Sequence, residues 1–301
     1  MIDRDIETST FAHLASSGIA PHYFGRFANG RIEGYLENCS NLVVMDLQKR
    51  TNMEAIAKQM AHLHQGFKVP PELQEYHNHS KPGLWTQLHA WMKQASAIDP
   101  DLGYKSKGDA ERAARLLNLT FVEQQLKWVE EEVVPKDSRV AFCHNDLLPA
   151  NIMKYNDTGI IRLIDFEYGG INFVGFDIAN HFNEFAGGPE KKSGDPDYSL
   201  FPDASEQKLF ITSYVRESQL LAGGGDNDDG NGGGNSDSDI QDQEVAKFSK
   251  EINAFVLANH LYWGLWAVIQ AAIEGTEEFD YLAYAWHRFN RYTEDKQELE
   301  F

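Results

Sequence analysis

The segment 140–153 combines residue types that can do chemistry with a spacing that can bring them together. Asp146 and Asn151 lie five residues apart in it, and a second aspartate, Asp165, follows the apolar run 160–164. A carboxylate can accept the proton of a hydroxyl group, and an amide oxygen with a second carboxylate can bind metal ions. The order therefore indicates a site where a hydroxyl is deprotonated beside a bound metal.

Two β-rich runs are expected to position these residues. The run 139–143 precedes the polar segment, the run 160–164 follows it, and the turn residues 156–159 lie between. An Asp, an Asn five residues later and an Asp after the next strand is the catalytic order of kinases. The alternative from spacing alone is a polar surface loop before an ordinary hairpin.

The composition limits the classes of function. The chain has 301 residues, of which 42% are hydrophobic, so it can bury a core in one large domain or two lobes. Its formal net charge of −19 disfavours binding to nucleic acid or to an anionic membrane, because like charges repel. A nucleotide can still bind where Mg²⁺ screens its phosphates.

The sequence also suggests a location. The two cysteines, Cys39 and Cys143, indicate neither a disulfide framework nor a zinc site, so a reducing compartment fits. The start of the chain is charged from its third residue, unlike a signal peptide. The apolar region 252–273 contains asparagine, histidine and glutamine, which favours a buried helix over a membrane span. We therefore expect a cytoplasmic protein without membrane insertion.

Helices are expected over most of the remaining chain. A first helix over 3–17 ends at Gly18, and Asn29-Gly30 joins two strands, 22–27 and 31–36, into a hairpin. Apolar spacing predicts further helices over 53–67, 85–97, 110–132, 205–221 and 244–274.

Two sets of residues recur at helical spacing beyond the catalytic segment. Asp177, His181 and Glu184 can share one face, although a helix cap with ordinary solvated residues is an equal alternative. Trp263 and Trp266 also share a face. Tryptophans in a long apolar helix usually belong to the core, but two indoles beside a carboxylate can form a cage for an ammonium group.

Residues 222–243 form an acidic, Gly-rich segment of low complexity. It contains almost no apolar side chain to bury, so we predict a disordered surface insertion between helices. Its alternating Asp and Asn resemble a calcium loop, but the EF-hand spacing with its closing Glu is absent.

Four motifs in sequence order resemble the choline/ethanolamine kinase family. They are His-Asn-Asp-Leu-Leu at 144–148, Ile-Asp-Phe-Glu-Tyr at 164–168, and the segments 175–187 and 262–270. The resemblance extends from Ile2 to the last helix, interrupted only by the acidic insertion. The Leu pair after the first aspartate, and the Asn-Glu-Phe-Ala-Gly run that ends the third motif, look more like ethanolamine kinases than choline kinases.

The resemblance implies a protein-kinase-like α+β fold with two lobes. Residues 1–40 would be a truncated N-terminal lobe of helix, hairpin and hinge, and 41–301 a large, mostly helical C-terminal lobe. The implied reaction is ATP- and Mg²⁺-dependent phosphorylation of ethanolamine to phosphoethanolamine, the first step of the CDP-ethanolamine route to phosphatidylethanolamine. The implied partners are ATP and a small amine, ethanolamine or choline, and a homodimer is left open.

The resemblance also implies roles for individual residues. Asp146 would be the base that deprotonates the hydroxyl, Asn151 and Asp165 would bind Mg²⁺, and Glu167 would lie close to a second ion. The remaining implied roles are substrate binding by Glu184, Trp263, Trp266, Tyr168, Tyr284 and Phe279, support of the catalytic loop by His144 and Asp177, and a nucleotide hinge at Glu33, Gly34 and Tyr35.

One family feature is missing from this sequence. Family members carry a small sheet ahead of the segment that matches residues 1–10. That sheet holds a phosphate-covering loop and a basic residue that pairs with a helix glutamate, here Glu7. We therefore expect the metal, base and alcohol sites without much of the ATP roof. The alternatives are a choline kinase, a catalytically impaired binding protein, and a phosphotransferase for another small amine or an aminoglycoside.

Overall fold

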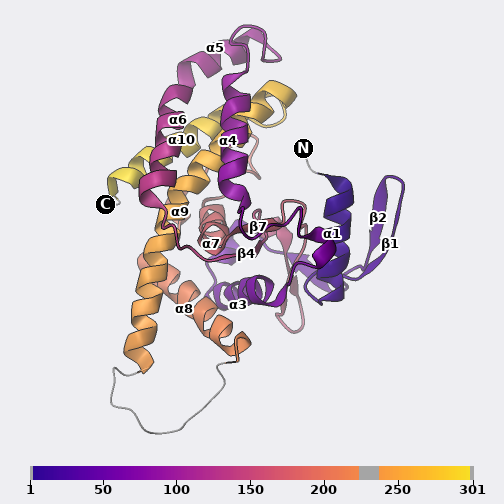
Figure 1. Cartoon of the computed structure of the whole chain (residues 1–301). Helices are drawn as coiled ribbons and strands as arrows, with labels where there is room; N and C mark the ends of the chain where they lie inside the picture. Colours follow the sequence, from indigo (N-terminus) through magenta and orange to yellow (C-terminus); the bar gives the residue numbers. More distant parts are fainter. Residues whose placement is uncertain (1–2, 224–236, 299–301) are drawn as a thin grey trace. The chain divides into compact units, whose positions relative to one another are not determined.

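A computed structural model describes residues 3–223 and 237–298 (Figure 1). The chain divides into two compact units. The predicted boundary between two lobes at residue 40 stays a prediction. The two units follow a different division, in which residues 1–40 belong to the same unit as several later segments. Unit 1 comprises Met1–Lys81, Arg139–Asp177 and Pro202–Lys250, and unit 2 comprises Pro82–Ser138, Ile178–Phe201 and Glu251–Phe301.

The first helix of unit 1 is α1 (Arg4–Ser16), as predicted. It begins where the Asp3 side chain accepts hydrogen bonds from two backbone N–H groups of the first turn, which would otherwise lack partners. It is followed by Gly18, whose φ of 72° lies in the left-handed region that glycine adopts without strain. In Figure 1 this helix lies beside the hairpin that follows it.

That hairpin consists of β1 (Tyr23–Phe27) and β2 (Gly30–Glu33), which pair antiparallel. The predicted hairpin is therefore confirmed, but its turn is Ala28-Asn29 rather than Asn29-Gly30. The reason is the register, in which Phe27 pairs directly with Gly30.

The strands around the catalytic segment belong to two small antiparallel sheets. One has the order β3 (Cys39–Asn41), β5 (Ile152–Tyr155), β6 (Ile161–Leu163), and the other pairs β4 (Val140–Cys143) with β7 (Gly170–Phe173). Both strands predicted around this segment are confirmed. The loop 144–151, which is the predicted catalytic loop, therefore leaves one sheet after β4 and enters the other at β5.

Helices cover the rest of unit 1. After the short α2 (Val44–Leu47), α3 (Arg50–Gly66) packs alongside α8 (Ala204–Leu221), and Figure 1 shows the two side by side. The predicted helices at these places are confirmed. The apolar face of α3 is fully buried at Ile56, Met60 and Leu63, as its spacing requires. Two 3₁₀ turns, Pro71–Leu73 and Pro149–Asn151, interrupt the loops.

Unit 2 is helical. Its elements include α4 (Gly83–Ser96), which packs on α6 (Leu119–Trp128), and α5 (Lys107–Leu116), which packs on α10 (Tyr281–Glu298) (Figure 1). The predicted helix over 85–97 corresponds to α4 and is confirmed.

The long helix predicted over 110–132 is wrong, because the structure breaks it. Leu117 is extended, with φ −106° and ψ 134°, and the side chain of Asn118 caps the next helix by accepting from the N–H of Phe121. The apolar spacing continues across this break and gives no sign of it. The second piece ends in a π-helical turn, Val129–Val133.

Two helices run across the boundary between the units. The first is α7 (Val174–Asn183), and the second is α9 (Asp237–Glu274). Within α9, Asp242–Glu274 is long and apolar enough to cross a membrane, but 89% of its most apolar window is buried inside the structure. Burial of this kind supports the predicted core helix.

The predicted insertion 222–243 is described only in part. Residues 224–236 lie outside the described residues. Residues 237–243 belong to the start of α9, and the predicted insertion stays a prediction.

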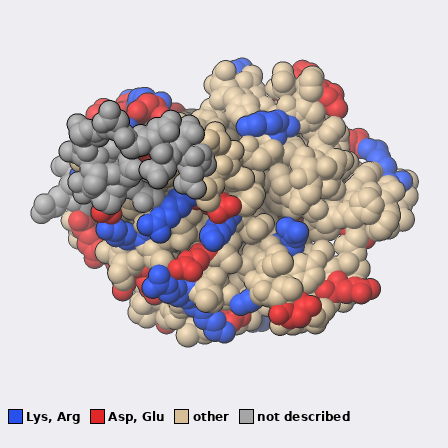
Figure 2. Space-filling view, turned by 90° about the horizontal axis from the view of Figure 1, so that it is seen from below, with Lys and Arg blue, Asp and Glu red and all other residues tan. Residues whose placement is uncertain are grey.

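The charges of the described surface are mixed. Figure 2 shows one face, on which Lys and Arg are interspersed with Asp and Glu and do not form one continuous basic area. Such a face offers little attraction for a polyanion, in agreement with the net charge.

Candidate active site

The predicted catalytic loop begins at His144, a fully buried residue directly after β4. Its Nε2 donates to the carbonyl oxygen of Ile164 at 2.9 Å, and its Nδ1 faces the backbone N–H of Asp146 at 3.4 Å. Burial lowers the pKa of His144, which keeps the ring neutral and therefore able to accept at Nδ1. His144 thus joins the loop of Asp146 to the strand end that precedes Asp165.

Asn145 adopts a left-handed backbone conformation with φ 66°. Asn is among the few non-glycine residues that tolerate this region. Its Nδ2 donates to the carbonyl oxygen of Tyr168 at 2.9 Å, and its Oδ1 accepts from Nδ2 of Asn172 at 2.8 Å. These bonds tie the loop to the segment before β7 and to β7 itself.

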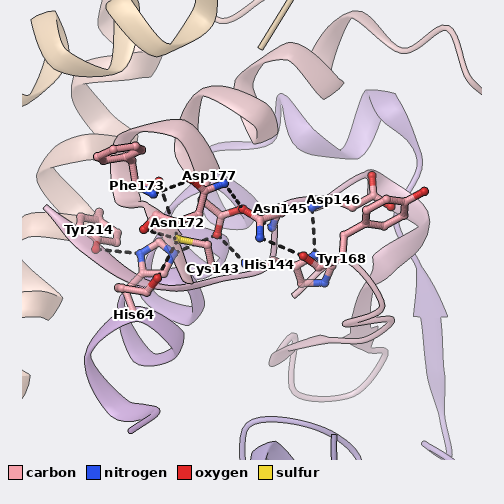
Figure 3. A network of polar contacts seen from close by, with 11 residues as sticks. His64, Cys143, His144, Asn145, Asp146, Tyr168, Asn172, Phe173, Asp177 and Tyr214 are labelled. Carbon is pink, nitrogen blue, oxygen red and sulfur yellow. Dashed lines mark hydrogen bonds and ion pairs between the residues drawn. The ribbon is translucent and has the colours of Figure 1, made fainter. Parts of the chain in front are cut away.

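Asp177 braces the start of the loop from the first turn of α7 (Figure 3). Its oxygens accept from the backbone N–H of His144 at 2.9 Å and from that of Asn145 at 2.7 Å. Its Oδ2 also accepts from Nε2 of His64 at 2.9 Å, and Nδ1 of that histidine lies 2.9 Å from the Tyr214 hydroxyl. This geometry is what the predicted supporting role of Asp177 requires.

The charge of Asp177 is stabilised although it is fully buried. Burial alone would raise its pKa, but the hydrogen bond and charge of His64, with the backbone N–H of His144, hold the pKa below its ordinary value. Cys143 lies close by, and donor atoms of His64, Cys143 and Asp177 are within 4.8 Å of one another. Burial and the charge of Asp177 raise the pKa of the Cys143 thiol, so it stays protonated and is unsuited to bind a metal.

Asp146 and Asn151 are joined within the same loop. Nδ2 of Asn151 donates to the backbone oxygen of Asp146 at 2.8 Å, and the backbone oxygen of Asn151 accepts from the N–H of Ile164 at 3.0 Å. The first bond uses the NH₂ end of the amide, which leaves its oxygen end as the candidate metal ligand. The second bond sets Asn151 beside the residue that precedes Asp165.

The predicted metal ligands fit Mg²⁺ by their chemistry. Asn151, Asp165 and Glu167 offer an amide oxygen and two carboxylates, the hard oxygen donors that this ion prefers. Asp165 has φ 61°, a left-handed conformation that redirects the chain directly after β6. Strain of this kind is often found at functional sites.

Glu167 is held by an ion-pair cluster. Nη1 of Arg4 lies 3.0 Å from Oε2 of Glu167 and 3.1 Å from Oε2 of Glu7. Glu7 also pairs with Arg31 of β2, whose guanidinium lies over the Phe11 ring at 4.2 Å. The hairpin that follows α1 thus supplies Glu7 with a basic partner, Arg31, from within the described chain.

The predicted hinge lies at the end of β2. Glu33 pairs with Arg31, and the N–H of Gly34 donates to the carbonyl oxygen of His22 at 2.7 Å. Tyr35 is largely exposed. The N–H of Gly34 is therefore engaged, so a nucleotide base would have to bind other backbone groups of this segment, and the hinge stays a prediction.

Glu184 is a buried carboxylate in unit 2, 5% exposed. It begins a 3₁₀ turn, Glu184–Ala186, directly after α7, so it is outside the helix that carries Asp177 and His181. Burial raises its pKa to about 7, against the lowering effect of Arg288 and with a further raising effect of Glu190. A cation beside this carboxylate would stabilise its ionised form.

The two tryptophans of α9 form part of an aromatic cluster. The rings of Trp263 and Trp266 are 5.5 Å apart and nearly perpendicular, and Trp266 continues to Tyr281 at 5.6 Å. Trp263 is buried and its Nε1 donates to Oδ1 of Asn180 at 2.6 Å, whereas Trp266 is partly exposed. Trp266 is therefore the better candidate for contact with a ligand. Phe279 contacts both Tyr281 and Tyr284 in the same cluster.

Comparison with known proteins identifies the family. The profile described as Choline/ethanolamine kinase matches residues 1–293. The chain belongs to the choline/ethanolamine kinase family. As a member of this family it is a kinase that acts on an alcohol.

Named relatives agree with this membership. Ethanolamine kinase 1 of Mus musculus is 32% identical over 305 residues, which cover 99% of this chain and 74% of the mouse protein. Probable choline kinase 1 of Arabidopsis thaliana is 31% identical, covering 96% of this chain and 73% of that protein. The structure of Plasmodium vivax ethanolamine kinase has a TM-score of 0.77 at 25% identity, covering 97% of this chain and 73% of that chain. The protein-kinase-like fold is thus confirmed.

A buried hydrogen-bonded chain in this family member was not predicted. Asn180 accepts from Trp263 and also from Nδ2 of Asn259 at 2.7 Å, and Asn259 accepts from the buried Arg288 through both its oxygens. The Arg288 guanidinium lies 5.8 Å from the Tyr284 ring centroid, so this predicted substrate residue already faces a cation. No local sequence pattern indicates this network, because Asn180, Asn259 and Arg288 come from three separate helices.

Proposed function

We propose that the chain transfers the γ-phosphoryl group of ATP to the hydroxyl of ethanolamine. The observation that carries the proposal is the catalytic loop, in which buried His144 and Asp177 hold Asp146 and Asn151 in a fixed backbone arrangement. Preorganised groups of this kind lower the barrier of phosphoryl transfer. The proposed location is the cytoplasm, which the two free cysteines support.

Asp146 is the proposed base. Its carboxylate accepts the proton of the substrate hydroxyl as the hydroxyl oxygen forms a bond to the γ-phosphorus. The bond from that phosphorus to the bridging oxygen of ADP breaks, and the negative charge leaves with ADP. Asn151, Asp165 and Glu167 would hold Mg²⁺, which neutralises charge on the phosphates.

Glu184 is the proposed acceptor of the substrate ammonium, with Trp266 as an aromatic face. Tyr168, Trp263 and Tyr284 remain further proposed substrate residues. Six of the eight similar proteins considered carry ethanolamine kinase in their names, which supports ethanolamine over choline. The two that are named choline kinases keep choline as the second candidate. The product, phosphoethanolamine, would enter phosphatidylethanolamine synthesis.

The test is an ATP-dependent phosphorylation assay with ethanolamine and choline in competition. The wild-type chain is compared with Asp146→Asn, and Asp157→Asn in the turn after β5 serves as the matched control. We expect ethanolamine to be preferred, with activity lost in Asp146→Asn and kept in the control. Preference for choline would reassign the substrate. No turnover from a folded wild-type chain would overturn the proposed reaction.

A further inference from the structure

Arg4 is the outermost member of the ion-pair cluster that reaches Glu167. One nitrogen, Nη1, lies 3.0 Å from Oε2 of Glu167 and 3.1 Å from Oε2 of Glu7. The Arg4 side chain is 67% exposed, whereas that of Glu7 is 8% exposed. Arg4 therefore bridges a buried carboxylate and the proposed metal ligand while most of its own surface faces solvent.

The cluster does not need Arg4 to neutralise Glu7. Arg31 already pairs with Glu7, and the Arg31 side chain is only 17% exposed, held also by Glu33 and the Phe11 ring. An exposed ion pair contributes little to stability, because water and salt screen its charges. The contacts of Arg4 are thus weakly stabilising and open to exchange, in contrast to the buried pair behind them.

A divalent cation would release Arg4 from Glu167. A carboxylate oxygen that binds Mg²⁺ forms a weaker hydrogen bond to the guanidinium, since both cations compete for the same lone pairs. The nucleotide phosphates arrive with this ion. An arginine presents a planar fork of donors that matches phosphate oxygens, and its exposed side chain is long enough to reorient.

We propose that Arg4 is a nucleotide-phosphate ligand that exchanges its partner. Without nucleotide it is held by Glu167 and Glu7, and when Mg²⁺-nucleotide binds it turns from Glu167 to the terminal phosphates. The proposal rests on the proposed function, because it requires a nucleotide site at Asp165 and Glu167. In this proposal α1 supplies a basic group, Arg4, for the phosphates, while Arg31 stays paired with Glu7.

The test is isothermal titration calorimetry with Mg²⁺-ADP, Mg²⁺-ATP and AMP on the wild type and on Arg4→Gln. Arg26→Gln is the matched control, because Arg26 is also exposed and pairs with Asp5 of the same helix at 2.7 Å. We expect Arg4→Gln to weaken ADP and ATP binding about tenfold, the size of one charge-assisted hydrogen bond, and to leave AMP binding within about twofold. The control should match the wild type for all three nucleotides.

A second readout uses the metal alone. Mn²⁺ binding without nucleotide, followed by electron paramagnetic resonance, should be tighter in Arg4→Gln than in the wild type, because Glu167 has lost its competitor. Equal nucleotide affinity in the wild type and Arg4→Gln would overturn this inference alone. Failure of the folded wild type to bind any of the three nucleotides would overturn the proposed function and this inference with it.

Discussion

The proposed role of Glu184 as acceptor of the substrate ammonium predicts that amine binding depends on pH. Glu184 is 5% exposed, and burial raises its pKa to about 7. Only the ionised carboxylate attracts an ammonium group. Roughly nine tenths of the side chains are ionised at pH 8 and about one tenth at pH 6, by the ordinary titration of a single group. The dissociation constant for ethanolamine should therefore rise about tenfold when the pH falls from 8 to 6.

The same shift has a consequence for stability with a definite sign. The folded pKa of about 7 lies above the ordinary value of 4.5, so the folded state holds this proton more tightly. Its contribution to stability is fully present below pH 4.5 and is lost as the pH rises through 7. The difference of 7 − 4.5 = 2.5 units corresponds to about 3 kcal/mol at most. An ammonium ligand that pairs with the ionised carboxylate would offset part of the free energy needed to ionise buried Glu184.

The assay is equilibrium binding of ethanolamine between pH 6 and 8 to the wild type and Glu184→Gln. The glutamine has the same shape but does not ionise, so its affinity should be weak and constant across the range. Choline is the second ligand, because its quaternary nitrogen carries no proton and any pH dependence then belongs to the protein. Urea unfolding of both proteins over the same range measures the stability term.

Two results would refute this reasoning. The first is an amine affinity of the wild type that stays constant from pH 6 to 8. The second is a pH dependence of equal size in Glu184→Gln, which would assign the titration to another group.

Further predictions concern the neighbours of Glu184 and the brace of the catalytic loop. Glu190→Gln should move the midpoint of amine binding to lower pH and Arg288→Leu to higher pH, since these charges act on Glu184 with opposite signs; movement in one direction for both would contradict this. Asp177→Asn, which disturbs an acceptor of three hydrogen bonds, should lower the free energy of unfolding at pH 7 by about 2–4 kcal/mol in urea titrations. The pKa of folded Asp177 lies below its ordinary value of 3.8, so this difference should be full above that pH and disappear only as the pH falls through the lower folded pKa; a difference that does not shrink on acidification below pH 3.8 would argue against a charge effect. Trp266→Ala should weaken ethanolamine binding and leave ADP binding unchanged, whereas unchanged ethanolamine affinity in a folded variant would place Trp266 in the core.

The local parts of the site could be predicted from the sequence. One loop carries Asp146 and Asn151, and the hairpin of β5 and β6 leads from that loop to Asp165. Their closeness along the chain therefore follows from their spacing in the sequence. The first helix was equally predictable, because its cap and its terminal glycine lie within the segment. Short-range geometry of this kind needs no knowledge of the tertiary structure.

The parts that depend on distant segments could not be predicted. Arg4 and Glu167 are 163 residues apart, and an ion pair between them leaves no local pattern. The same holds for His64, which reaches Asp177 across 113 residues. The break at Leu117 was missed for a different reason: apolar spacing continues through it, and a single capping asparagine decided the outcome.

Two left-handed residues show how the loop is held in place. Asn145 and Asp165, with φ 66° and 61°, flank the pair of contacts that His144 makes. Each such conformation costs roughly 1 kcal/mol or more for a residue other than glycine. For Asn145 the cost is offset by two side-chain hydrogen bonds and by a backbone bond to Asp177. The left-handed conformation of Asn145 therefore persists because several buried hydrogen bonds hold it, and these bonds also fix the backbone that leads into Asp146.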